Sequence, residues 1–115
     1  MNAPFATLSL GHYYLQGGLL YRKVDDHLVK RVVDSRTEAA PRGHEPVEPV
    51  TIGCRKEAWP IPVDEQEWLA WRVLDAGIAA VRLQPVGVGA TEHQAIAAFA
   101  AELESDLQGE HHAVR

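Results

Sequence analysis

The segment D-E-Q-E-W-L-A-W-R-V-L-D-A-G, from Asp64 to Gly77, carries the clearest helix signals in the chain. Asp64 is a favourable N-cap residue, and Glu67 stands three positions later, where a capping box places its carboxylate. Gly77 is placed to adopt the left-handed conformation that commonly ends a helix. The sequence therefore predicts a helix over residues 64–77, around which the rest of the domain is organised.

Several apolar residues of this predicted helix fall on one broad arc when successive residues are placed about 100° apart. They are Leu69, Ala70, Val73, Leu74 and Ala76. Trp68 and Trp71 lie outside this arc, so we expect them on another face of the helix. The two indoles are then covered either by another part of the chain or by a partner.

Trp68 and Trp71 are the leading candidates for a functional surface, because tryptophan is enriched at the centres of binding interfaces. Arg72 and Asp75 would give this surface a charged rim, and Trp59 lies close to the predicted helix start. We therefore predict a partner-binding surface, of which a homodimer interface is the simplest form. The structural alternative is that the Trp59 segment or a long loop folds over the two indoles.

The first third of the chain has the alternating pattern of strands. It predicts a three-stranded antiparallel meander with strands at Ala6–Leu15, Leu19–Val24 and His27–Asp34. Gly17 and Gly18 form a two-residue loop suited to a tight hairpin. In that register Tyr14 stands opposite Tyr21, which would help to fix the pairing.

The remaining segments complete the predicted fold. Residues 35–49 contain three prolines and a glycine and predict a long surface loop. Two further strands are expected at Val50–Arg55 and Ile78–Leu83, a second helix from Thr91, and a frayed tail over 109–115. The predicted fold class is α+β, with two helices packed on one face of a mainly antiparallel sheet, in the order β-β-β-β-α-β-α.

Length and composition favour a single domain over residues 1–115. Only one cysteine is present, and no signal peptide or membrane-spanning stretch precedes the first strand, so we expect a cytoplasmic protein that does not enter a membrane. The net charge is −5 and is unevenly distributed. Residues 1–56 carry eight Lys and Arg against six Asp and Glu, whereas residues 57–115 carry three against ten.

The meander combines basic and aromatic side chains, which is typical of surfaces that bind single-stranded nucleic acid. The candidate residues are Arg22, Lys23, Lys30, Arg31, Tyr13 and Tyr21. Neighbours in a strand point to opposite faces, so no single face collects all four cations. Nucleic-acid binding is therefore an alternative to protein binding, and not the leading hypothesis.

A third hypothesis is a small enzyme that uses Cys54, the only thiol. None of the sequence signatures of cysteine hydrolases surrounds this residue. The six histidines show no metal-binding spacing, and Gly87 and Gly89 lack the rest of a dinucleotide or phosphate-loop motif. The sequence thus predicts no catalytic residue, no metal and no cofactor.

Two short segments resemble known families. The stretch G-A-T-E-H-Q-A-I-A-A-F-A-A-E-L from Gly89 is similar to the strand-to-helix passage of HicB-like antitoxin domains. The stretch Y-Y-L-Q-G-G-L-L-Y-R-K-V from Tyr13 resembles the start of the zinc-binding region of retroelement integrases, without the His and Cys ligands that follow there. Neither resemblance assigns a function to the chain.

The leading hypothesis is a non-catalytic protein-binding module that acts as an inhibitor, adaptor or accessory protein, and a phage or mobile element is a plausible source for a protein of this size. Its partner is another protein or a second copy of itself. The alternatives are a nucleic-acid-binding or HicB-like antitoxin module that uses the meander, and an enzyme that uses Cys54.

Overall fold

The computed structural model describes residues 2–57, 67–76 and 79–113, which fold into two compact units. Unit 1 is Met1–Thr51 and unit 2 is Ile52–Arg115. The elements of unit 1 are β1 (Ala3–Pro4), the 3-10 turn η1 (Phe5–Thr7), β2 (Tyr13–Gln16), β3 (Leu19–Lys23), β4 (Leu28–Arg31) and β5 (Thr37–Ala39). Strand β6 (Pro46–Glu57) passes from unit 1 into unit 2, which continues with β7 (Glu67–Ala76), β8 (Ala79–Gly89) and α1 (Glu92–Ala113).

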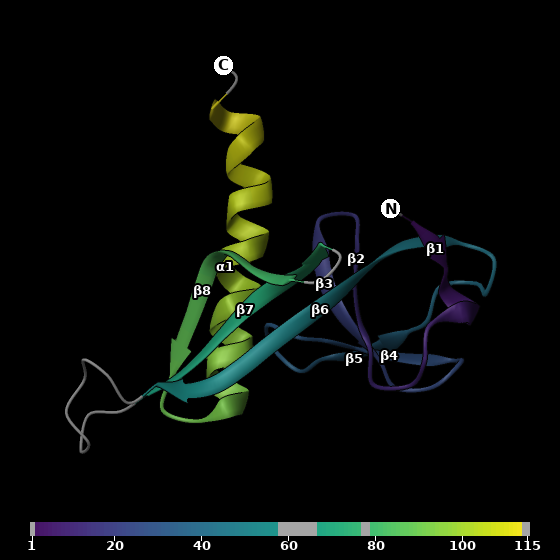
Figure 1. The fold of residues 1–115 in the computed structure, drawn as a ribbon. Helices are drawn as coiled ribbons and strands as arrows, with labels where there is room; N and C mark the ends of the chain where they lie inside the picture. The colour runs from purple at the N-terminus through teal and green to yellow at the C-terminus, as the bar shows by residue number, and fades with distance from the viewer. Residues whose placement is uncertain (1, 58–66, 77–78, 114–115) are drawn as a thin grey trace. The chain divides into compact units, whose positions relative to one another are not determined.

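The predicted meander is present in unit 1, where the strands pair antiparallel in the order β5-β4-β3-β2-β6 (Figure 1). Gly17 and Gly18 connect β2 to β3 with φ angles of 63° and 78°, which glycine adopts without the steric cost that other residues meet. Tyr14 pairs with Tyr21, and their rings stack with centroids 5.4 Å apart. The predicted hairpin register is therefore confirmed.

The hydrophobic core of unit 1 is built around Tyr14, which is completely buried. Phe5 meets its ring edge to face at a centroid distance of 5.5 Å, and Leu8, Val29 and Val47 complete the cluster. The N-terminal residues reach this core because β1 pairs with β6, Ala3 lying opposite Val47.

The expected strand over Ala6–Leu15 is wrong up to residue 12, because the chain forms the turn η1 and a loop before β2 begins at Tyr13. Buried Lys23 explains this conformation. Its ammonium group donates hydrogen bonds to the backbone oxygens of Phe5 at 3.1 Å and Leu8 at 2.8 Å. It also lies 4.5 Å from the centroid of the Phe5 ring. A charged side chain from β3 thus holds the N-terminal turn against the core.

The segment after β3 is organised by Asp25, whose carboxylate accepts hydrogen bonds from the backbone N–H groups of His27 and Leu28, each at 2.7 Å. Strand β4 then pairs with β5, so the predicted loop over residues 35–49 contains β5 and the beginning of β6. Helix α1 continues to Ala113, and so includes part of the tail for which we expected fraying.

Unit 2 overturns the prediction around Asp64–Gly77. Residues 67–76 form the strand β7, which pairs antiparallel with β8, while residues 64–66 and Gly77 lie outside the described part of the chain. The predicted α+β fold with two helices on one sheet face is therefore wrong. The described residues form eight strands, all paired antiparallel, and one α-helix.

The reason for this error is that a strand with apolar residues on both faces imitates the apolar arc of a helix. On one side of β7, Ala70 is completely buried and pairs with Gly87. On the other side, Leu69 and Trp71 are half-buried. Trp68 and Trp71 did not fit the predicted helical arc, and this misfit was the available signal for a strand.

Helix α1 packs on the face of the β7–β8 hairpin that carries Ala70 (Figure 1). Two glycines allow this contact, since a Cβ atom at Gly87 would collide with backbone atoms of Ala95 and Phe99, and one at Gly89 would lie 2.6 Å from the backbone nitrogen of Ala95. The predicted helix start is confirmed, because the Gln94 N–H donates to Thr91 Oγ1 at 3.2 Å. No helix in the described ranges has the length and apolar character needed to cross a membrane.

Candidate interaction surfaces

The two predicted tryptophans lie on opposite faces of the hairpin. Opposed residues of an antiparallel pair share a face, so Trp68, which pairs with Gly89, lies on the face that α1 covers. Trp71 is three positions further along and pairs with Val86, on the other face. The two indoles therefore do not form the single patch that helical spacing suggested.

Trp71 is held in place by its neighbours on β6. A Cβ atom at Gly53 would lie only 2.7 Å from Nε1 of the indole, so the ring packs directly on the glycine backbone. The Arg55 guanidinium lies 5.8 Å from the ring centroid, which is within cation–π range. Trp71 is half-buried, and part of this fixed aromatic surface is therefore accessible.

The outer face of the hairpin, defined as the face opposite α1, is apolar around Trp71. Leu69 and Val86 are half-buried there, and Val88 is 46% exposed. Strand β8 is also the last strand of the sheet order, with no strand hydrogen-bonded to its second edge within the described part of the chain. An apolar face and an open strand edge thus lie next to each other.

Two of the other residues predicted for the tryptophan surface, Arg72 and Asp75, lie further along β7. Arg72 is half-buried and follows a register irregularity between Trp71 and Arg72. Asp75 pairs with Ala80 in the hairpin. Trp59 lies outside the described residues.

The basic and aromatic candidates of the meander separate into three groups by their exposure to solvent. Arg22 and Lys30 are exposed, and they face each other across β3 and β4. Lys23 is buried, with 2% of its surface exposed, and its ammonium group is engaged by the backbone oxygens of Phe5 and Leu8. Arg31, Tyr13 and Tyr21 are half-buried.

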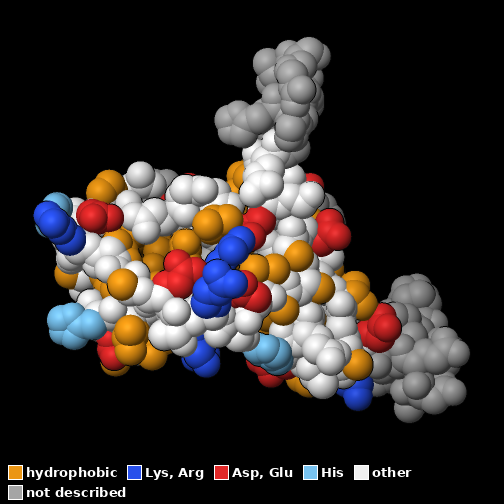
Figure 2. Space-filling view, turned by 180° about the vertical axis from the view of Figure 1, so that it is seen from behind, with side chains coloured by type: hydrophobic (Ala, Val, Ile, Leu, Met, Phe, Trp, Pro, Cys, Tyr) orange, Lys and Arg blue, Asp and Glu red, His pale blue; other side chains and the backbone are white. Residues whose placement is uncertain are grey.

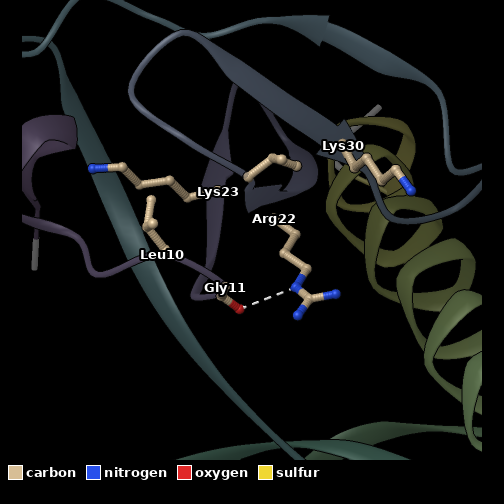
Figure 3. A pocket seen from close by; sticks show the side chains of 6 residues that line it. Leu10, Gly11, Arg22, Lys23 and Lys30 are labelled. Atoms are coloured by element: carbon tan, nitrogen blue, oxygen red, sulfur yellow. Dashed lines mark hydrogen bonds between the residues drawn. The ribbon is translucent and has the colours of Figure 1, made fainter.

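Arg22 and Lys30 border an open hollow of about 410 Å³ on unit 1 (Figure 3). Leu10, Gly11, Lys23 and Val24 complete its lining. On the face that Figure 2 shows, Lys and Arg side chains occur singly or in small groups, often with acidic side chains beside them. That face thus shows no broad basic patch, and the hollow itself has two exposed cations, Arg22 and Lys30.

Cys54 does not have the properties of an activated nucleophile. Burial raises the pKa of its thiol, and the nearby Glu92 carboxylate raises it further. A catalytic cysteine needs the opposite shift, because the thiolate is the reactive species. The described residues also contain no cluster of three or more His, Cys, Asp and Glu side chains able to hold a metal ion.

Sequence reasoning missed the burial of Lys23 and the hollow beside Arg22. A charge in an alternating strand predicts solvent exposure, and only the tertiary position of the N-terminal turn shows that Lys23 points inward. The available sequence signal for the loop between η1 and β2 was Gly11. Its φ angle of 86° is one that glycine adopts more readily than other residues. Comparison of the chain with family models, with curated proteins and with solved structures gave no match.

Proposed function

We propose that the chain is a non-catalytic protein-binding module that associates with a second copy of itself through strand β8 and the adjoining outer face of the hairpin. The observation that carries this proposal is the open edge of β8. This strand spans 11 residues and ends the strand order of the described sheet. An unpaired strand edge of this length is a template for pairing with another strand.

A second copy is the partner that fits this edge most simply. Two identical strands that pair antiparallel are related by a two-fold axis, so the contact closes after two subunits. The sheet would continue from one hairpin into the next. Val88 and the neighbouring Trp71 surface lie beside this edge, so their half-exposed apolar area would lose solvent contact to the second hairpin.

Trp71 would lose little conformational entropy at such a contact, which favours binding. The indole of Trp71 is already fixed between Gly53 and Arg55, so little side-chain entropy remains to be lost on association. Trp68 is expected to contribute only to folding, because it lies on the face covered by α1.

The test is the molar mass from light scattering over a wide range of protein concentration, combined with the variant Val88→Lys. We expect the parent to form a dimer that dissociates on dilution. The substitution introduces one positive charge on β8 of each subunit, within the proposed contact. We expect the dissociation constant of the variant to rise about tenfold, because the contact would then bury an unpaired charge where the parent buries an apolar side chain.

The matched control is Leu28→Lys, which places the same charge at a residue of similar exposure on β4 of unit 1. This variant should dimerise as the parent does. A parent that remains monomeric at all concentrations would refute self-association. A dimer weakened equally by both substitutions would show that β8 is not the contact.

A further inference from the structure

We propose that the hollow beside Arg22 and Lys30 binds a peptide carboxylate that lies next to an aliphatic side chain. The carboxylate can belong to the C-terminus of a peptide or to an acidic side chain, since both present the same two oxygens. This inference concerns unit 1 alone and does not depend on self-association through β8.

The two cations are placed on the same side by the strand register. Arg22 lies opposite Lys30 in the β3–β4 pair, and Figure 3 shows both side chains leaving the strands in a different direction from Lys23. Directly opposed residues have Cβ atoms about 5 Å apart, so the two long side chains can reach one anionic group together.

Arg22 is held in a fixed position before any ligand arrives. Its Nε donates a hydrogen bond to the backbone oxygen of Gly11 at 3.2 Å, and its guanidinium lies 5.9 Å from the centroid of the Tyr13 ring. The guanidinium carries five N–H donors, and this bond uses only one of them. A carboxylate can therefore meet an ordered pair of donors, which reduces the entropy lost on binding.

The charges of Arg22 and Lys30 are not neutralised within the described part of the protein. Neither side chain has an ion-pair partner there, whereas Lys23 pairs with Asp26 at 3.4 Å and Arg36 with Asp34 at 4.0 Å. An anionic ligand would supply the missing countercharge.

Two accessible aliphatic side chains, Leu10 and Val24, also line the hollow. Leu10 is 63% exposed and Val24 is 42% exposed, although both are aliphatic. An aliphatic side chain next to the bound carboxylate would cover these residues. The hollow thus combines an anion contact with a hydrophobic contact at short range.

The same residues fit a single-stranded nucleic acid less well. Base stacking needs free aromatic faces, but Tyr21 stacks on Tyr14 and the Tyr13 ring lies beside the Arg22 guanidinium. Buried Lys23 cannot neutralise a phosphate. Two cations beside two aliphatic residues favour a short peptide.

The test is a titration of the ¹⁵N-labelled chain, followed by NMR, with three acetylated peptides. One is Gly-Gly-Leu with a free C-terminal carboxylate, the second is its C-terminal amide, and the third is Gly-Glu-Leu-Gly with an amidated C-terminus. We expect saturable shifts of the Gly11 amide and the Arg22 Nε–H signals with the first peptide, the third or both, and none with the amide of the first. The arm that binds identifies the source of the carboxylate.

Arg22→Gln and Lys30→Gln should each weaken binding about tenfold, because each removes a charge-assisted contact. Arg42→Gln is the control, since Arg42 is exposed on unit 1 but does not line the hollow. The proposal is overturned if no peptide shifts these signals at millimolar concentration and low salt, if the three variants bind alike, or if only an oligothymidine produces the shifts.

Discussion

Replacement of Lys23 by Met tests whether a buried ammonium group holds the N-terminal turn of unit 1. The methionine keeps most of the side-chain volume, so the change removes the charge without opening a large cavity. Two hydrogen bonds are lost, to the backbone oxygens of Phe5 and Leu8. The Phe5 oxygen keeps its bond from the Leu8 N–H at 3.1 Å, so the main loss falls on the Leu8 oxygen.

The expected magnitude follows from these contacts. A buried backbone group left without a partner costs about 1–3 kcal/mol. Loss of the ammonium also removes its desolvation penalty, which partly offsets this cost. We therefore expect the free energy of unfolding of unit 1 to fall by about 2 kcal/mol. The backbone amides of Phe5, Ala6 and Leu8 should also lose protection from hydrogen exchange, because the turn is no longer tethered to β3.

The assay is urea unfolding followed by the NMR amide signals of residues 2–51, which report on unit 1. Lys30→Met is the matched control on the neighbouring strand, and its exposed side chain should change the free energy of unfolding by no more than roughly 0.5 kcal/mol. If Lys23→Met leaves unit 1 as stable as the parent or makes it more stable, the desolvation penalty exceeds the bonds and the tether argument is refuted.

Three further outcomes follow from the packing and protonation of single residues. Tyr14→Phe should leave unit 1 unchanged or stabilise it by about 1 kcal/mol in urea unfolding, because the buried Tyr14 hydroxyl has no hydrogen-bond partner among the described residues. Burial raises the pKa of Tyr14, so the parent should lose stability as the pH rises above about 10, and the Phe variant should lose less. Gly87→Ala should destabilise unit 2 by about 1–3 kcal/mol, because the added Cβ collides with the α1 backbone. Urea unfolding followed by tryptophan fluorescence measures this change. An unchanged unfolding midpoint would mean that α1 does not lie on β8. Because the pKa of Cys54 is raised, its thiol should react with a disulfide reagent at pH 8 several-fold more slowly in the folded chain than in urea. For the same reason, the stability that the protonated thiol contributes should fall as the pH rises above about 8.5. Equal rates in the two states would contradict the raised pKa.

The sequence predicted the parts of the fold that depend on local chemistry. The Gly17-Gly18 turn, the pairing of Tyr14 with Tyr21 and the start of α1 at Thr91 each rest on residues close in the chain. Turn geometry and capping decide such features almost alone.

Long-range packing decided the features that the sequence did not predict. Residues 67–76 satisfy helical and strand periodicity almost equally, and the choice depends on β8, whose Gly87 and Gly89 leave space for α1 on one face. The same applies to the candidate site. Trp68 and Trp71 share a helical face but occupy opposite faces of a strand, so an error in secondary structure divided the predicted surface.

The division of charge between the two units favours a local anion contact over nucleic-acid binding. Residues 1–56 have an excess of positive charge, but Arg55 and Lys56 belong to unit 2. Unit 1 contains six Lys and Arg and six Asp and Glu, so its net charge is zero, and unit 2 contains five against ten. A polyanion approaching either unit would therefore meet no long-range attraction. The attraction of Arg22 and Lys30 extends about one Debye length, roughly 8 Å at physiological salt, which suits one carboxylate and not a strand of phosphates.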